Sequence, residues 1–590
     1  MSLWLPTTRK EMDELGWEEA DVIIFSGDAY IDHPSFGPAV IARVIEHEGL
    51  KVAVVPQPNW KDDLRDFRKL GKPRYFFAVT AGNMDSMVNH YTAAKRIRSD
   101  DAYTPGGKAG FRPDYPTILY TGILKSIFPD VPVIIGGIEA SMRRLTHYDY
   151  WKDRLEPSIL AASRADLLIY GMGERPVKEV LKLLQKGVPF SSIKSVPQTG
   201  YMQELLIPIP PRKPWNTLML NAYEKCLSDN SAFADNFVRF EKESNKINAS
   251  RLVEAYKEFN IVINPPFPPA STDESDEIYD LPFNYLPHPR YRKKGPIPAY
   301  EMIKYSVNIH RGCFGGCSFC AIAAHQGKHV SSRSEESVLR EITRIQNLPG
   351  FSGYLSDLGG PSANMYGMKG INMDICEKCS RPSCIWPETC DNLDTSHSRL
   401  TRLYRKVNSL DGIRKAFVGS GIRYDMLFRQ GNPKAGKGET DYLEELLRNH
   451  VSGRLKVAPE HTAGHVLSLM RKKSFSLFKI FRKHFYDITR SYSLNYELIP
   501  YFISSMPGCT VQDMRDLARE VRELGLRIEQ VQDFTPTPMT LSTVMFYTGF
   551  DPYTGKKIFV EKRPEGKIRQ KNLFFPRDRN TGGFRQVHQP

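Results

Sequence analysis

The chain has 590 residues, a hydrophobic share of 41% and a formal net charge of +14. This length exceeds one ordinary hydrophobic core, so we expect two or three domains. The first residues lack the apolar stretch of a secretory signal, and no apolar run approaches the ~20 residues of a membrane span, which favours a cytoplasmic protein without membrane contact. The positive charge, which thickens toward the C-terminus, indicates either RNA as a partner or a solvated basic surface.

Residues 1–205 alternate apolar runs with amphipathic helices. Five runs have the length of buried strands: residues 20–27, 51–58, 74–82, 131–140 and 165–173. Helical patterns lie between them at residues 37–48, 115–128 and 176–186. This alternation predicts a doubly wound parallel sheet.

Between residues 206 and 298 the alternation gives way to a helical stretch and then to proline-rich text (NPPFPPASTDESDE, LPHPRYRKKGPIP). Such a composition buries little apolar surface. We therefore predict a helical and proline-rich connector over residues 206–298.

A second alternating series fills residues 299–545. Its six candidate strands are residues 306–312, 354–360, 415–421, 454–460, 496–504 and 527–534, and helical stretches follow several of them. Six strand–helix units predict a partial (β/α)6 barrel, a partial TIM barrel whose chemistry belongs on loops at the carboxyl ends of the strands. Residues 546–590 are basic and polar, and we predict a mobile tail or thin extension there.

Three cysteines, Cys313, Cys317 and Cys320, directly follow the first strand of the second series, within HRGCFGGCSFC. Clustered cysteines in a protein without a secretory signal indicate metal ligation rather than disulfides. Three thiolates on one glycine-rich loop can hold three irons of a [4Fe–4S] cluster and leave the fourth iron open to S-adenosylmethionine (SAM). One-electron reduction would then release a 5′-deoxyadenosyl radical. The alternative is a zinc knot completed by His310.

A second cysteine group lies in a predicted insertion near residues 371–393. It consists of Cys376, Cys379, Cys384 and Cys390. Four thiolates can close a zinc site or fully ligate an auxiliary iron–sulfur cluster, and the spacing does not separate these two. Unligated reduced thiols are a third alternative.

Several longer phrases carry a family resemblance. With the motif GCxxxCxFC, the phrases SGDAYIDHPSFG, IIGGIEASMRR, GIRYDM, KVAPEHT, PYFISSMPG and QVQDFTPTP resemble the YgiQ family of radical SAM proteins over almost the whole chain. The resemblance implies an N-terminal Rossmann-like or cobalamin-binding-like domain, a [4Fe–4S] cluster, SAM, and an electron donor such as flavodoxin or ferredoxin.

The resemblance also implies roles for residues around the cluster. Phe319 is similar to the aromatic residue that packs near the adenine of SAM, with ordinary packing as the alternative. Gly359 and Gly360 stand where a GGE-like motif meets the methionyl amino group, but Pro361 replaces the acidic residue, so only a backbone-carbonyl contact is expected. Three further residues stand where ribose- or carboxylate-binding groups lie, or have structural roles: Ser420, Arg423 and Glu460.

The N-terminal phrases do not assign a cofactor or a single role to their polar residues. Cobalamin proteins with a histidine ligand carry DxHxxG, whereas Asp32 and His33 are adjacent here (DHPSFG), so the sequence does not favour cobalamin. Asp28, Asp32 and His33 belong to a substrate site, or Asp32 and His33 cap the following helix. Glycines after the fourth and fifth strands, at 136–137 and 171–173, would let a cofactor or the barrel approach the sheet closely.

These motifs predict a radical SAM enzyme that abstracts hydrogen from a substrate that the sequence does not specify. The first alternative is a radical SAM methyltransferase or methylthiotransferase acting on RNA or protein. The second, from another class, is a non-catalytic, metal-stabilised RNA-binding protein whose two cysteine groups are structural.

Overall fold

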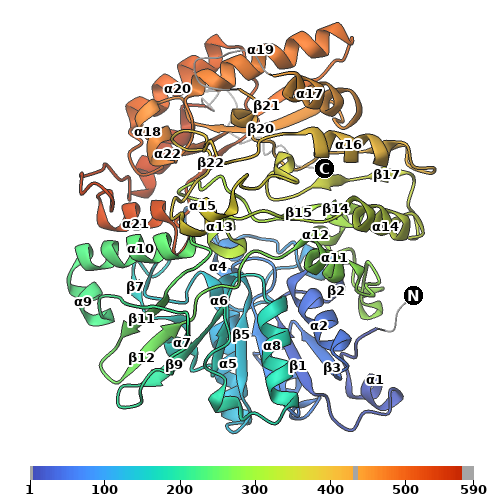
Figure 1. Ribbon diagram of the computed structural model, residues 1–590, viewed down its shortest axis with the longest axis vertical. Coiled ribbons are helices and arrows are strands. Elements are labelled where there is room, and N and C mark those ends of the chain that lie inside the picture. The colour runs from blue at the N-terminus through green and yellow to red at the C-terminus, as the bar shows by residue number, and fades with distance from the viewer. Residues whose placement is uncertain (1–3, 429–435, 575–590) are drawn as a thin grey trace.

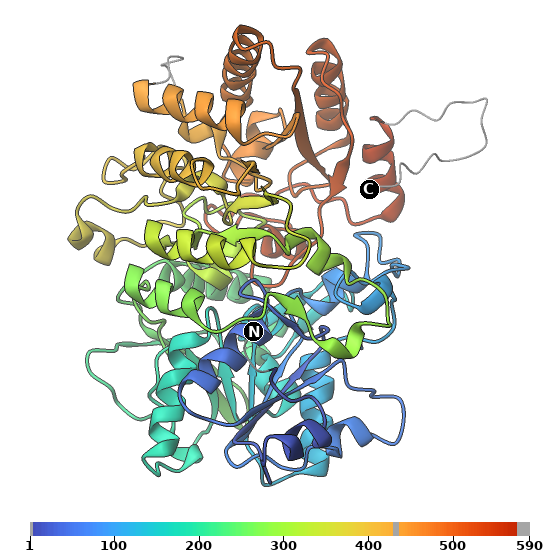
Figure 2. The same cartoon turned by 90° about the vertical axis from the view of Figure 1, so that its right-hand side faces the viewer.

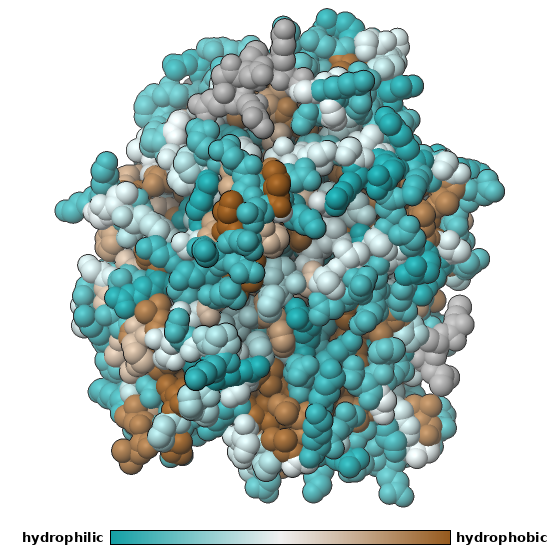
Figure 3. Space-filling view, in the orientation of Figure 1, coloured by the Kyte–Doolittle hydropathy of each residue, from teal (hydrophilic) through white to brown (hydrophobic). Residues whose placement is uncertain are grey.

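The computed structural model describes residues 4–428 and 436–574. Two α/β halves lie along the long axis of the molecule, the N-terminal half at one end and the C-terminal half at the other (Figures 1 and 2). No helix in these two ranges is both long and apolar enough to cross a membrane. The face shown in Figure 3 is mostly hydrophilic, with scattered apolar side chains.

A nine-stranded sheet forms the N-terminal half, in the order β10-β11-β12-β9-β8-β5-β4-β1-β3. All five strands predicted for residues 1–205 are present and pair in parallel: β1 (Val22–Ser26), β3 (Val52–Pro56), β4 (Phe76–Thr80), β5 (Val133–Gly136) and β8 (Leu167–Ile169). Counted in chain order they run 2-1-3-4-5, an order typical of doubly wound sheets. The strand predicted over 131–140 ends early, because Gly137 takes a φ of +84° and α6 (Gly137–Ser141) begins there.

Three predicted helices also match the structure. They are α2 (Gly37–His47), α5 (Pro116–Ile127) and α8 (Glu174–Gln185). Each carries apolar residues at three- and four-residue intervals and buries that stripe against the sheet or a neighbouring helix.

The segment predicted as a connector differs from the structure in its first half. It supplies β10 (Thr217–Met219), β11 (Arg251–Ala255) and β12 (Phe259–Ile263), and β12 pairs antiparallel with β9 (Thr199–Glu204). Two helices, α9 (Tyr223–Ser228) and α10 (Asn230–Ser244), lie between β10 and β11. The N-terminal sheet therefore continues well past residue 205.

The proline-rich remainder packs back on the first half. Its strand β13 (Leu286–Pro287) pairs with β2 (Ile31–Asp32), and Asn284 donates two hydrogen bonds to the Asp32 carboxylate, which also pairs with Arg43. Asp32 and His33 do not cap α2, because the N-cap position is Phe36 and has no side-chain hydrogen bond. The Asp28 carboxylate is likewise paired, because it accepts a hydrogen bond from the Arg112 guanidinium at 2.6 Å.

The C-terminal half contains strands at all six predicted positions, in six short segments, and all of these strands pair in parallel except β15 (His310–Arg311), which pairs antiparallel with β16 (Ser331–Ser332). The segments are β14 (Ser306–Asn308) with β15, β17 (Tyr354–Leu355) with β18 (Asp357–Gly359), β19 (Lys415–Ala416), β20 (Arg454–Glu460), β21 (Glu497–Ser504) and β22 (Val531–Asp533). The parallel pairs follow chain order, β14 with β18, β17 with β19, and β20 with β21 and β22. One parallel bridge, Ile422 to Val457, links the third segment to the fourth.

One long helix follows each of the first five segments. They are α14 (Glu335–Gln346), α16 (Ser398–Asn408), α17 (Lys437–Asn449), α19 (Phe475–Ser491) and α20 (Val511–Glu523). Shorter helices near the site are α11 (Thr272–Asp280), α13 (Ile322–Gln326), α15 (Met373–Lys378) and α18 (Gly464–Leu469).

The first part of the expected basic extension is packed rather than free. After α21 (Leu541–Thr548) the chain forms α22 (Pro564–Asn572), whose Gln570 side chain accepts from the Ser505 backbone at 2.8 Å. Lys567 of the same helix reaches the N-terminal half and donates to the Tyr150 hydroxyl at 2.9 Å. The remainder of the expected tail, residues 575–590, lies outside the described residues.

Candidate functional site

The cysteine loop leaves β15 and enters α13. Its backbone is tightly wrapped, because Cys313 N–H donates to the Gly327 carbonyl at 3.1 Å and Cys320 N–H to the Cys317 carbonyl at 3.1 Å. Gly312 has a φ of +85°, and a methyl group there would lie 2.1 Å from the His329 carbonyl oxygen. The loop thus needs its glycine, as the sequence pattern predicts.

The three thiols are half-buried and close enough to influence one another. Burial raises the pKa of Cys313, and burial together with the charge of Cys317 raises the pKa of Cys320 to about 12. Iron–sulfur clusters bind cysteines as thiolates, and metal binding releases the thiol protons. The donor set therefore fits an iron–sulfur cluster in its chemistry.

Neither cysteine group is drawn together as ligands of one ion. Within residues 4–428 and 436–574, no three His, Cys, Asp or Glu side chains form a group that could hold a single metal ion, and this includes the zinc knot of His310 with the triplet.

Arg423 lies against the cysteine loop. Its Nη1 is 3.3 Å from Cys317 Sγ, and its Nε and Nη2 donate to the Asp425 carboxylate at 2.9 and 2.6 Å. Burial opposes the guanidinium charge, but Asp425 and the thiols outweigh burial and raise the pKa of Arg423 well above its ordinary value. A permanent cation therefore stands beside Cys317.

Gly359 ends β18 and Gly360 follows it, and both lie beside the strand that leads into the cysteine loop. The Gly359 carbonyl accepts from Ile309 N–H at 2.8 Å, and a methyl group on Gly360 would lie 2.5 Å from the His310 ring. Ser420 lies next to Gly359, and its hydroxyl donates to Asp357, which also accepts from Gly419 N–H at 2.9 Å. Asp357 thus fixes the Ser420 side chain.

Glu460 ends β20 with a φ of +69°, buried and 3.8 Å from the Lys472 ammonium. Burial raises the pKa of Glu460, and its own charge contributes to the raised pKa of Cys320, so the two residues are near each other. Phe319 is half-buried and packs on the main hydrophobic core.

The residues predicted for the site thus gather where the parallel segments end, with Arg423 touching Cys317, Glu460 near Cys320 and Ser420 against Gly359. The positioning residues Asp357 and Asp425 were not predicted. Both stand two residues from a predicted one, and in GIRYDM the i, i+2 pairing of an arginine and an aspartate was the available signal.

The second cysteine group lies directly on the cysteine loop. Cys384 N–H donates to the Phe314 carbonyl at 3.0 Å, and the Ser383 hydroxyl donates to the Gly315 carbonyl at 2.8 Å. Burial raises the pKa of Cys384 to about 11; Lys328 opposes this, and the charges of Cys379, Cys390 and Cys376 add to it. All four thiols are therefore within electrostatic reach of one another.

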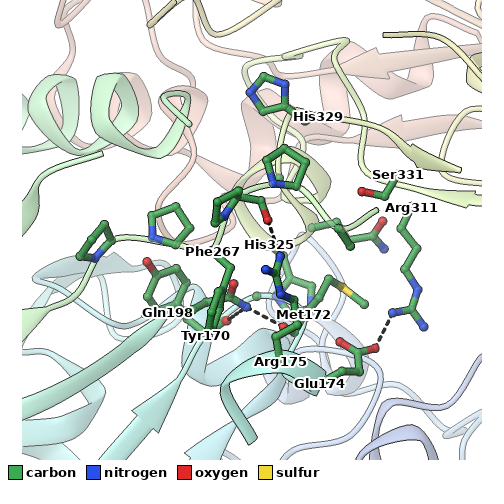
Figure 4. A pocket seen from close by; sticks show the side chains of 18 of the residues that line it. Tyr170, Met172, Glu174, Arg175, Gln198, Phe267, Arg311, His325, His329 and Ser331 are labelled. Carbon is green, nitrogen blue, oxygen red and sulfur yellow. Dashed lines mark hydrogen bonds and ion pairs between the residues drawn. The ribbon is translucent and has the colours of Figure 1, made fainter. Parts of the chain in front are cut away.

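A cavity of about 500 Å³ lies between the two halves (Figure 4). The N-terminal half contributes the residues after β8, among them Tyr170, Met172 and Glu174, and the C-terminal half contributes α13 and the strand that follows. Gly171 lets the halves meet closely, since a methyl group there would lie 3.0 Å from the His325 carbonyl oxygen. Of the glycines expected to allow a close approach, Gly171 thus meets the segment after the cysteine loop, whereas Gly136, Gly137 and Gly173 contact only the N-terminal half.

Comparisons with known proteins agree with this architecture. A family model described as radical SAM N-terminal matches residues 4–306. A UPF0313 protein of Porphyromonas gingivalis is 57% identical, covering 97% of this chain and 90% of the relative, and one of Bacteroides thetaiotaomicron is 55% identical, covering 97% and 94%.

Among solved structures, the radical SAM methyltransferase TsrM of Kitasatospora setae, with cobalamin and a [4Fe–4S] cluster bound, aligns with a TM-score of 0.50. The alignment covers 97% of this chain and 93% of TsrM at 13% identity. At this identity the likeness concerns the fold alone.

Proposed function

Since the chain belongs to the UPF0313 family, a radical SAM-associated family, we propose that it is a radical SAM enzyme whose [4Fe–4S] cluster is held by Cys313, Cys317 and Cys320. The observation that carries the proposal is the half-buried thiol triplet on a single glycine-wrapped loop, with the Arg423 cation 3.3 Å from Cys317. When bound, the cluster and SAM supply reductive cleavage of SAM to methionine and a 5′-deoxyadenosyl radical.

The chain's own residues position and shield this chemistry. Arg423 offsets negative charge at the thiolates, and Asp425 holds its guanidinium in place through two hydrogen bonds. Ser420, fixed by Asp357, and Glu460 offer polar groups to a ribose or an amino group, while the backbone of Gly359 and Gly360 offers a carbonyl to the methionyl end.

We further propose that the six parallel segments of the C-terminal half form the wall of a partial (β/α)6 barrel. Their pairing in chain order and the helix after each of the first five support this arrangement. A barrel wall places Gly359, Ser420 and Glu460 at its carboxyl ends, where barrel enzymes carry their chemistry.

The second cysteine group is proposed as a further metal site that braces the cysteine loop, either an auxiliary iron–sulfur cluster or zinc. The backbone hydrogen bond from Cys384 to Phe314 supports a direct mechanical link between the two. Histidine-ligated cobalamin is not part of the proposal, because the DxHxxG spacing is absent and His33 is fully buried.

Anaerobic reconstitution tests the proposal. The wild type, reduced by dithionite or by flavodoxin or ferredoxin, should convert SAM to 5′-deoxyadenosine, and Cys317→Ala should not. Cys226→Ala, which removes a lone buried cysteine of α9, is the matched control and should retain the reaction. S-Adenosylhomocysteine as the main product would favour a methyltransferase instead, and failure to take up iron would contradict both.

A further inference from the structure

The interdomain cavity is large enough for a small-molecule ligand and is partly aromatic. Its volume is about 500 Å³, and its lining includes Phe240 together with Tyr170 and Phe267, which Figure 4 labels. The lining includes none of the triplet cysteines, nor Ser420, Arg423 or Glu460. The cavity is therefore distinct from the residues proposed for SAM, although α13 joins the two directly.

Arg144 lines this cavity and stands out by its charge. Its side chain is buried, the residue being 3% exposed, and the guanidinium lies 4.6 Å from the ring centres of both Tyr170 and Phe240. Its one hydrogen bond among the described residues goes from Nη1 to the Ser141 carbonyl, and no carboxylate of residues 4–428 or 436–574 pairs with it. Burial lowers the pKa of Arg144 to about 10, which still leaves it cationic at neutral pH.

The other arginines that line the cavity each pair with a carboxylate. Arg311 pairs with Glu174, Arg333 with Glu341, and Arg175 with Glu274 at 3.2 Å. A buried charge without a counter-ion is costly, and buried charges in proteins are as a rule paired. The unpaired guanidinium facing a ligand-sized cavity thus points to an anionic group as the missing partner.

Neutral hydrogen-bonding groups accompany Arg144. Burial lowers the pKa of His325 and of His329 to about 4, so both imidazoles are uncharged at neutral pH. Both side chains line the cavity (Figure 4), and they add no charge to it.

We propose that this cavity binds an anionic small molecule, and that the carboxylate or phosphate group of this ligand is bound by Arg144. The inference goes beyond the proposed function and does not rest on it. The Arg144 guanidinium lies near two rings and makes one hydrogen bond, which leaves further N–H groups free in the planar fork that suits either oxyanion.

Binding of simple probes to the full-length, cluster-loaded protein tests this proposal. Phenyl phosphate and benzoate share an aromatic ring with neutral benzyl alcohol, and titration calorimetry should show one or both anions binding at least tenfold more tightly than the alcohol. Whichever anion binds more tightly identifies the group. Arg144→Met should abolish the preference, whereas Arg175→Met, which removes a paired arginine of the same lining, should keep it.

Three results would overturn the proposal: equal affinity for anions and benzyl alcohol, a preference that survives in Arg144→Met, or displacement of the anion by SAM, which would assign Arg144 to the SAM carboxylate. The wild-type comparison remains decisive if Arg144→Met does not fold. Because the assay measures binding and not SAM cleavage, its failure leaves the radical reaction standing, and loss of that reaction in Cys317→Ala leaves the binding measurable.

Discussion

Gly316 is the position where the cysteine loop and the second cysteine group are most tightly fitted. Its φ is +62°, and a methyl group there would lie 2.2 Å from the Pro382 carbonyl oxygen and 2.8 Å from Ser383 Cβ. Both atoms belong to backbone or to a short side chain, so neither can swing aside. Gly316→Ala should therefore separate the loop from the insertion.

The expected loss of folding stability in Gly316→Ala has two contributions. A left-handed conformation costs a non-glycine residue about 1–2 kcal/mol, and forcing a methyl group into a packed contact costs a further ~1–3 kcal/mol. Gly525 provides a matched control, because its φ is +61° and nothing lies within 4 Å of its added methyl group. Gly525→Ala should show only the first contribution.

Iron and sulfide per chain after anaerobic reconstitution measure the outcome. We expect Gly316→Ala to retain much less iron than the wild type and to expose Cys384 to thiol reagents, while Gly525→Ala keeps the wild-type content. Equal iron in both variants would refute the idea that the insertion holds the loop in place.

Three further predictions concern charge, pH and the second metal. Arg423→Gln combined with Asp425→Asn should lower the cluster's midpoint potential by about 60 mV in an EPR-monitored titration. The Arg423 charge, 3.3 Å from Cys317 Sγ, interacts with a thiolate by ~5 kcal/mol, and roughly a quarter of this energy remains after the opposing charge of Asp425. Asp425→Asn alone should raise the potential, and shifts of the same sign would contradict this. Burial raises the pKa of Glu254 to about 7, against hydrogen bonds from Thr146 and Tyr256, so the folded state keeps a proton that the unfolded state releases near pH 4.5. The free energy of unfolding of Glu254→Gln, relative to that of the wild type, should therefore increase by up to about 3 kcal/mol as pH rises from 4.5 to 7, and its melting temperature should rise relative to the wild type. A difference in melting temperature that stays constant with pH would contradict this. Cys384→Ala should lose the second metal in elemental analysis and keep the iron of the triplet; loss of both would make the two groups one site.

Much of the fold is readable from the sequence because buried parallel strands form continuous apolar runs, as in β1 and β3. Strands β10 to β12 were missed although β11 and β12 have five residues each, as β1 and β3 do, because the proline-rich text that follows them resembles a linker. Sheet pairing across the chain, here β12 with β9, decides their place and leaves no local signal.

The candidate site shows the same division. The cysteine spacing alone indicates a cluster, whereas the electrostatic role of Arg423 depends on Asp425 and on a contact made across the fold. Arg143 and Arg144 are adjacent in the sequence, yet Arg143 is paired with Asp85 and Arg144 faces the cavity without a carboxylate among the described residues. No sequence pattern distinguishes two such neighbours.

The Mössbauer spectrum of ⁵⁷Fe-reconstituted protein, recorded before and after addition of SAM, is the most direct test. The Cys384→Ala variant would leave only the iron held by Cys313, Cys317 and Cys320. We predict a cubane cluster in which a single iron site changes its isomer shift when SAM is added. A spectrum in which every iron is insensitive to SAM would mean that no iron is open to the cofactor, and would contradict the proposed function.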